Sequence, residues 1–183
     1  MKEEGDSLVS FHEAKTKYRA IFDYCFKETE YIFHGKGLKL CLTAIDHKAL
    51  YAWKQQWGQP GRSWDWEALC QSQLHTLAKR LTIAIWDGDI LVGLAFGKVS
   101  KAKRLISFSY VQGDSSYTGP LKGHVASIVT LAGILIGERV GASHVAFLDP
   151  VNSKVENHYA NIGYRKGFLY GIKKAMFLDI KNL

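Results

Sequence analysis

The sequence contains little cysteine and little proline, with three of each in 183 residues. Cys25, Cys41 and Cys70 are too few and too scattered for a disulfide framework or a zinc site, so we expect no metal. Each cysteine lies within an apolar pattern. This pattern favours reduced thiols in the core of a cytoplasmic protein.

A long apolar run is also missing. A membrane helix needs roughly 18 consecutive apolar residues, whereas the most apolar stretch, Val125 to Ile136, is interrupted by Ser127, Thr130 and Gly133. The first residues are polar and acidic and lack the apolar segment of a signal peptide. We therefore expect no membrane partner and a cytoplasmic location.

What the chain has in excess is positive charge. It carries 24 Lys and Arg against 17 Asp and Glu, a formal net charge of +7. Such a surplus favours a polyanionic partner, which is either nucleic acid or a phosphorylated cofactor. With 47% hydrophobic and 22% charged residues, the composition fits one globular domain, with or without an appendage, and excludes a disordered chain.

The N-terminal half begins with helical periodicity. Residues 10–33 carry one apolar helical stripe, and Ser10 with Glu13 forms a capping-box pattern that places the helix start at Ser10. The stripe ends at a glycine-rich segment, residues 34–37, which stops the helix.

A strand and two helices are expected next. Residues 38–45 are typical of a strand. Asp46 can cap a following helix, and Ser63 or Asp65 can cap another whose apolar stripe runs over 66–81 and includes Leu74 and Leu77.

An antiparallel meander of three strands follows. The β-rich runs 81–86 and 90–99 are joined by Asp87-Gly88-Asp89, and Asp-Gly between apolar runs is a strong hairpin signal. Residues 105–111 alternate between apolar and serine positions and form the third strand.

The second half returns to alternating helices and strands. The sequence predicts a polar loop at 112–122, a helix from Gly123 to Gly141, a strand at 144–148, a helix at 153–161 and one or two strands within 168–180. The fold class expected from this order is α/β (α+β), with a mixed, mostly antiparallel sheet flanked by helices.

The late strand and helix carry a recognisable spacing. Asn152 follows the strand, Tyr159 comes seven residues later, and Gly163 and Tyr164 come four and five after that. This spacing, in this place of the element order, resembles the GCN5-related N-acetyltransferase (GNAT) superfamily. Residues 87–93 resemble the second hairpin of that family.

The resemblance covers about residues 38–180 and implies a division of the chain. Residues 1–37 would be an N-terminal helical extension, and 38–183 a GNAT-like acyltransferase domain. The resemblance implies an N-acetyltransferase that uses acetyl-CoA or another acyl-CoA, in which a small-molecule or macromolecular amine acceptor attacks the thioester directly. A strand amide would stabilise the tetrahedral intermediate. The acceptor stays unidentified, and a homodimer is an open alternative to a monomer.

The resemblance also assigns site residues. Tyr159 would protonate the departing CoA thiolate, a task that suits a phenol because it is neutral at pH 7. A tyrosine that only packs the core is its alternative role. Cofactor contacts are assigned to the backbone of Tyr110, Val111 and Gln112, and to Lys122, Gly123, His124, Val125 and Asn152. A glycine loop that leads into a helix also presents backbone N–H groups to a pyrophosphate, and Lys122 adds a cation. Asn152 has a turn-forming role as its alternative.

The acceptor side offers fewer candidates. Trp64, Ser107 and Ser109 are the expected substrate-pocket residues. The strand at 105–111 has no carboxylate to act as a general base. A water held by Ser107 or Ser109 is one substitute, and the others, by position only, are Asp65, Glu67, Asp114 and His124.

Two other functions remain open from the sequence. A nucleic-acid-binding or nucleic-acid-modifying protein on the same fold is favoured by the net charge and by basic residues at 101–104 and 165–174. A catalytically silent acyl-CoA-binding domain is favoured by the missing strand carboxylate.

Overall fold

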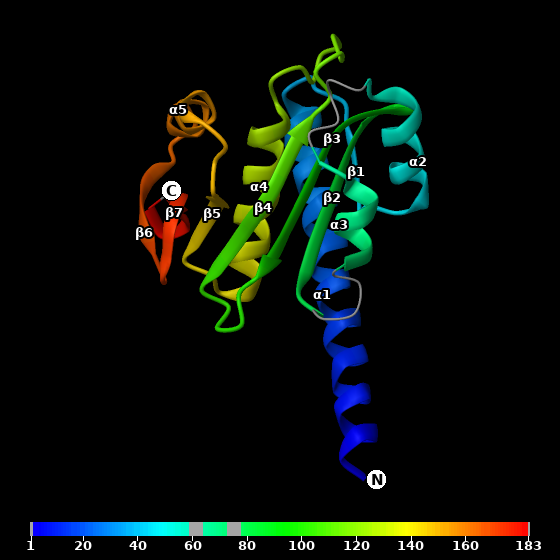
Figure 1. The fold of residues 1–183 in the computed structure, drawn as a ribbon, viewed down its shortest axis with the longest axis vertical. Helices are drawn as coiled ribbons and strands as arrows, with labels where there is room; N and C mark the ends of the chain where they lie inside the picture. Colours follow the sequence, from blue (N-terminus) through cyan, green and yellow to red (C-terminus); the bar gives the residue numbers. More distant parts are fainter. Residues whose placement is uncertain (1, 59–63, 73–77, 183) are drawn as a thin grey trace.

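A central sheet with helices on both faces makes up the computed structural model, which describes residues 2–58, 64–72 and 78–182 (Figure 1). The order of elements confirms the predicted fold class. The elements are α1 (Lys2–Gly35), β1 (Cys41–Thr43), α2 (His47–Gln56), α3 (Trp66–Ser72), β2 (Arg80–Asp87), β3 (Ile90–Val99), β4 (Leu105–Gly113), α4 (Val125–Val140), β5 (His144–Leu148), α5 (Ser153–Asn161), β6 (Arg165–Leu169), β7 (Ile172–Asp179) and the 3-10 turn η2 (Ile180–Asn182).

The seven strands form one sheet in the order β1-β2-β3-β4-β5-β7-β6. β4 and β5 pair in parallel, and all other neighbours pair antiparallel. The predicted hairpin at Asp87-Gly88-Asp89 joins β2 to β3, and Gly88 has a φ of 57°, the left-handed region that glycine tolerates. The mixed, mostly antiparallel sheet is therefore confirmed.

β4 and β5 stop pairing about halfway along β4. Their pairing runs from Leu105 opposite His144 to Phe108 opposite Phe147, whereas β4 continues to Gly113. On its other side β4 stays paired with β3, with a bulge at Ser109 because Phe96 faces Tyr110 and Gly97 faces Phe108. In the described strands, the β5-facing edge of β4 beyond Phe108 thus has no strand beside it.

Two hydrophobic cores lie on the two faces of the sheet. One face packs against α1 and α4, the other against α2 and α3 (Figure 1). The second core is rich in tryptophan: Trp53, Trp57 and Trp66 are all buried in it. The stripe predicted on α1 enters the first core through Tyr18, Phe22, Cys25, Phe26 and Phe33. The boundary between residues 37 and 38 stays a prediction.

Two predicted boundaries in the N-terminal half are wrong. α1 begins at Lys2 instead of Ser10, so Ser10 lies within the helix and has no helix end to cap; propensity does not explain this, because Gly5, Asp6 and Ser7 are weak helix formers. β1 covers only Cys41–Thr43 of the predicted strand, because backbone N–H groups on either side of it donate to side chains and not to a neighbouring strand. Leu40 N donates to His34 Nε2 (3.1 Å), and Ile45 N donates to Thr82 Oγ1 (3.1 Å).

The helix caps predicted after β1 can be compared in part. Asp46 caps α2, with Ala49 N donating to its carboxylate at 2.9 Å, and Asp65 caps α3 through Ala68 N at 3.0 Å. The expectations for Ser63, Leu74 and Leu77 fall outside the described residues. The stripe predicted to reach Leu81 is wrong at that end, because Leu81 lies in β2 opposite Gly97.

Boundaries in the C-terminal half also shift. β4 runs on to Gly113, two residues past the predicted end. α4 begins at Val125 instead of Gly123, because Gly123 has a left-handed φ of 81° that a helix cannot include. Gly141 ends α4 as predicted, with a φ of 76°. The last segment forms two strands, and β6 starts at Arg165, before the predicted 168.

The cysteines divide into two groups. Cys25 and Cys70 are buried as predicted, but Cys41 is exposed on the short edge strand β1, which corrects its expected place in the core. Burial, reinforced by the nearby Glu28, raises the pKa of Cys25 to about 11, so this thiol stays protonated at neutral pH. Within the described ranges, no cluster of His, Cys, Asp and Glu could hold a metal, and no helix is long and apolar enough to cross a membrane.

Candidate cofactor cleft and active site

A cleft of about 400 Å³ lies where β4 separates from β5. Its walls come from β3 and β4, from the loop between β4 and α4, from the start of α4 and from one face of α5. The lining residues are Val92, Val111, Gly113, Asp114, Tyr117, Leu121, Lys122, Gly123, Val125, Ala126, Lys154, Val155, His158 and Tyr159. Four of the predicted cofactor residues, namely Val111, Lys122, Gly123 and Val125, therefore meet Tyr159 in one cleft.

The loop after β4 is held by its own polar side chains. Asp114 N donates to Val92 O (2.9 Å), and the Asp114 carboxylate accepts from both the backbone N and the hydroxyl of Ser116 (3.0 and 2.8 Å). The Tyr117 hydroxyl donates to Asp87 (2.7 Å) and accepts from Leu121 N (3.2 Å). Burial and the Asp87 bond raise the pKa of Tyr117, which keeps this donor protonated. The loop thus enters α4 along a fixed path.

The start of α4 presents backbone N–H groups to the cleft. His124 is the N-cap residue, and its side chain makes no cap hydrogen bond to the helix. The first amides of a helix have no acceptor within it, and they carry the positive end of the helix dipole. Gly123 precedes them with nothing within 4 Å of its Cβ position, so a ligand can approach the backbone closely.

Two glycines let α4 sit this close to the sheet. A Cβ added at Gly93 would lie 2.9 Å from Val125 Cγ2, and one added at Gly113 would lie 3.2 Å from it. Both distances are shorter than ordinary van der Waals contact between carbons. The lack of a side chain at Gly93 and at Gly113 therefore allows the first turn of α4 to lie this close to β3 and β4.

The cations around the cleft are placed in different ways. Lys122 lines the rim, but its ammonium donates to Ser115 O (2.9 Å) and is thereby held across the loop. Lys154 and His158 reach the cleft from α5. The charge balance of the lining favours an anion, with Asp114 as the one carboxylate among its described residues.

Tyr159 occupies the inner wall of the cleft. Only 8% of it is exposed, and its ring stacks on that of Phe147, with centroids 4.1 Å apart and planes at 7°. Burial raises the pKa of Tyr159 to about 12, so its hydroxyl is neutral and able to donate. Within the described part of the chain, this hydroxyl has no hydrogen-bond partner, which leaves it available to a ligand.

The remaining β4 candidates turn to the opposite face of the sheet. Gln112 accepts a hydrogen bond from Trp66 Nε1 (2.9 Å), and the Tyr110 ring meets Trp64 edge-on at 5.5 Å. These side chains belong to the tryptophan-rich face and do not line the cleft. The prediction for Tyr110, Val111 and Gln112 concerned their backbone, which lies along the edge of β4 that β5 leaves open.

Several other predicted residues lie outside the cleft lining. Ser107 is buried in β4 with 2% exposure, whereas Ser109 is exposed at the bulge. Asn152 caps α5, with Val155 N donating to its side chain at 3.0 Å, which is the turn-forming role of the alternative prediction. Of the suggested bases, Glu67 pairs with Lys54 and Asp65 caps α3.

Some cleft residues escaped the sequence analysis. Lys154, Val155 and His158 were not predicted, although they stand at helix offsets 0, 1 and 4 with the predicted Tyr159 at offset 5, a spacing that puts all four on one face of α5. This helical spacing could have indicated the three residues from the sequence alone. The contacts of Tyr117 with Asp87, 30 residues away, and of Val125 with Gly93 had no local signal.

A scan of protein-family models finds no match to this chain, and a search of curated proteins finds none either. Solved structures do match. They are GNAT-fold acetyltransferases, and their likeness confirms that this chain has the GNAT fold. At 12–16% identity, the likeness shows the fold and not the activity.

Three of these structures are representative. The ribosomal-protein-S18-alanine N-acetyltransferase of Escherichia coli is 14% identical and covers 77% of this chain and 94% of its own, with a TM-score of 0.56. A variant of the spermidine N-acetyltransferase SpeG of Vibrio cholerae is 16% identical and covers 78% and 95%, with a TM-score of 0.56. The PaiA N-acetyltransferase of Thermoplasma acidophilum, in complex with coenzyme A, is 12% identical and covers 78% and 99%, with a TM-score of 0.55.

Proposed function

We propose that this protein is an acetyl-CoA-dependent N-acyltransferase that acts on an amine. One observation carries the proposal: an unpartnered, neutral phenol, Tyr159, shares a cleft with the N-terminal amides of α4, at the place where β4 and β5 separate. The amides suit a phosphate and the phenol suits a leaving group that gains negative charge.

The residues present fit a coenzyme A thioester. Gly123 and the first turn of α4 would hold the pyrophosphate, since the Cβ position of Gly123 meets nothing within 4 Å and the His124 side chain does not cap the helix. Lys154 and His158 would add positive charge from α5. The open edge of β4, from Tyr110 to Gln112, would pair with the amide groups of the pantetheine arm as a neighbouring strand would.

Acetyl-CoA supplies an acyl group activated as a thioester. Tyr159 holds a proton on its hydroxyl and would give it to the departing sulfur when the thioester is bound. The acceptor amine attacks as the neutral base, and its proton leaves to water. Asp114 is a poor acceptor for that proton because it already receives two hydrogen bonds from Ser116.

We place the acceptor on the face of the sheet that carries α2 and α3. Trp64 and the bulge at Ser109 lie beside the part of β4 that follows Phe108 and does not pair with β5. Ser107 is too buried to contact an acceptor. An aromatic border suits a cationic or alkyl amine, so spermidine and the alanine of ribosomal protein S18, the acceptors named for two structural neighbours, are the first to test.

The test combines binding and turnover. Titration calorimetry with acetyl-CoA should show saturable binding, and Tyr159→Phe should keep that affinity within about twofold. Turnover with an accepted amine should fall at least about 100-fold in Tyr159→Phe, the usual size of a lost general acid.

Tyr164→Phe is the matched control. The Tyr164 hydroxyl bonds Thr130 (3.0 Å) in the core, so this variant loses some stability and keeps its turnover. Wild-type turnover in Tyr159→Phe would remove the assigned role. No binding at millimolar acetyl-CoA would overturn the proposal, and tight binding without turnover on any amine would favour the silent acyl-CoA-binding domain. Salt-sensitive binding of tRNA without acetyl-CoA binding would favour the nucleic-acid alternative.

A further inference from the structure

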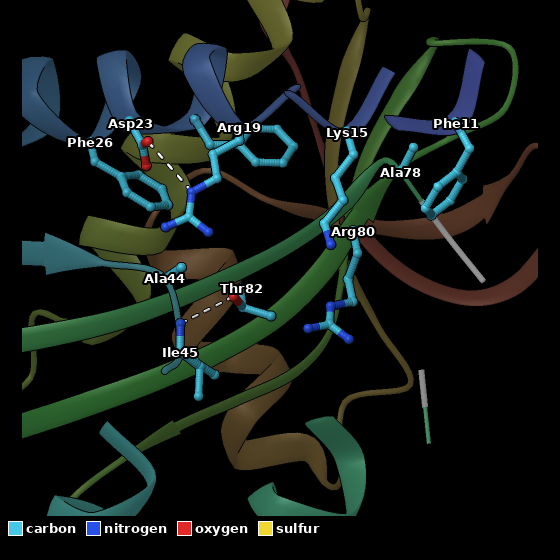
Figure 2. A pocket seen from close by; sticks show the side chains of 11 residues that line it. Phe11, Lys15, Arg19, Asp23, Phe26, Ala44, Ile45, Ala78, Arg80 and Thr82 are labelled. Carbon is cyan, nitrogen blue, oxygen red and sulfur yellow. Dashed lines mark hydrogen bonds and ion pairs between the residues drawn. The ribbon is translucent and has the colours of Figure 1, made fainter. Parts of the chain in front are cut away.

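A second cavity lies at the other end of the sheet, between α1 and β2 (Figure 2). It holds about 260 Å³. Arg80, at the start of β2, is one of its walls and pairs with Lys98 on β3, while the cofactor cleft begins at Val92 on the same strand. Lys98 lies six residue steps along the strand from Val92, which is roughly 20 Å. The two cavities are therefore separate.

The cavity exists because β1 is short. β1 stops at Thr43, opposite Ala84, so the edge of β2 from Arg80 to Ile83 has no strand beside it. α1 covers this open edge from above, and Ile45 N donates to Thr82 Oγ1 at its floor (3.1 Å; Figure 2). A space bounded by helix, strand edge and loop is left between them.

Positive charge dominates the lining. Lys15, Arg19 and Arg80 line the cavity together with one acid, Asp23. Arg19 pairs with Asp23 at 3.8 Å. Among the described residues, neither Lys15 nor Arg80 has a carboxylate partner. Figure 2 shows Lys15 extending from α1 toward the strand that carries Arg80.

Arg80 is held in place for binding. One of its guanidinium nitrogens donates to Cys70 O (3.2 Å), and its guanidinium carbon lies 5.7 Å from the centre of the Phe96 ring. A guanidinium has five N–H donors, so most remain available to a ligand. Lys98 stands directly opposite Arg80 in the ladder, and like charges there are unfavourable until an anion joins them.

The other walls are apolar. Phe11, Phe22 and Phe26 from α1 and Ile45 from the loop after β1 line the same space. We propose that this cavity binds a small organic anion, a carboxylate that carries an aromatic or branched apolar group. Its carboxylate would pair with Arg80 and Lys15, a charge-assisted arrangement, and its apolar part would lie against the phenylalanines.

Benzoate is the probe, with benzyl alcohol and inorganic phosphate as comparisons. Calorimetry on the full chain should show one benzoate site, with benzyl alcohol and phosphate each at least tenfold weaker. Arg80→Gln and Lys15→Gln should each weaken benzoate binding by about tenfold or more, the size expected for lost hydrogen bonds to a charged group.

Lys17→Gln is the matched control, because Lys17 is exposed on the same helix and does not line the cavity. It should change benzoate affinity less than twofold. Acetyl-CoA binding should be the same in all three variants, which separates this site from the proposed function. Any of three results would overturn the proposal. The first is no benzoate binding at millimolar concentration, and the second is equal binding of benzoate and phosphate. The third is unchanged benzoate affinity in both Arg80→Gln and Lys15→Gln.

Discussion

The two ends of the sheet carry two proposed anion sites that differ in the groups they offer a ligand. At the cofactor cleft, the groups that face a ligand are the backbone amides of α4, beside Gly123, and a phenol, Tyr159. At the α1 cavity they are the side chains of Lys15 and Arg80. Backbone donors are fixed by the fold, so they tolerate varied sequence, whereas the cavity depends on particular residues.

The charge of the chain follows the same division. The β2–β3 hairpin end of the meander carries Asp87 and Asp89, while basic residues gather at its opposite end. These are Lys79, Arg80, Lys98, Lys101, Lys103 and Arg104. Much of the net charge of +7 therefore lies away from the cofactor cleft. Its field would act first on the anion proposed for the α1 cavity.

Gly93→Ala tests whether acetyl-CoA binding in the cleft depends on the close approach of the α4 backbone to β3. The new Cβ would press on Val125, whose branched side chain has little rotameric freedom. We expect a loss of about 1–3 kcal/mol in the free energy of unfolding, as overpacking usually costs. Acetyl-CoA affinity should fall with it, because the amides of α4 are displaced. Urea unfolding and calorimetry measure the two effects.

Gly35→Ala is the control for that substitution. An added Cβ there meets nothing within 4 Å, at the last residue of α1. Stability should stay the same or rise slightly. Benzoate binding at the α1 cavity should survive in Gly93→Ala. If it disappeared together with acetyl-CoA binding, the two ends would not be independent.

Local signals predicted most of the fold. The Asp-Gly hairpin, the caps Asp46 and Asp65 and the glycine stop at Gly141 each depend on a few adjacent residues, and each is present. The spacing from Asn152 to Tyr164 pointed to Tyr159, which lines the cleft, and its catalytic role stays a prediction. Helix and strand ends were less predictable, because β1 is cut short by contacts with His34 and Thr82.

The long-range parts of both sites could not be predicted. The cleft loop depends on a bond between Tyr117 and Asp87, and α4 depends on two glycines of other strands. The α1 cavity joins Lys15 to Arg80, which are 65 positions apart in the sequence. Nothing in either segment alone indicates that the helix covers that strand edge.

The pH dependence of stability probes the buried phenol of the cleft. The folded pKa of Tyr159, about 12, is above the ordinary value of 10. The stability that its neutral form contributes is therefore complete below pH 10 and is lost between pH 10 and 12. By pH 11 the loss should be about 1 kcal/mol.

Urea unfolding of wild type and Tyr159→Phe at pH 8 and pH 11 measures this contribution. Tyr164, whose pKa is also raised by burial, is present in both proteins and cancels in the comparison. The wild type should lose more stability than the variant as the pH rises. An equal loss in both would mean that Tyr159 ionises in the folded protein as readily as a free phenol.

The smallest effect concerns the like-charge pair at the basic end. Lys98→Glu would place a carboxylate opposite Arg80 in the ladder and should raise the free energy of unfolding by about 0.2–1 kcal/mol. The gain should shrink in high salt. Lys101→Glu makes the same change in net charge at the turn, away from Arg80 in the ladder, so an equal gain there would assign the effect to net charge. Because the new carboxylate competes for Arg80, Lys98→Glu should also weaken benzoate binding while acetyl-CoA binding at the far end stays unchanged.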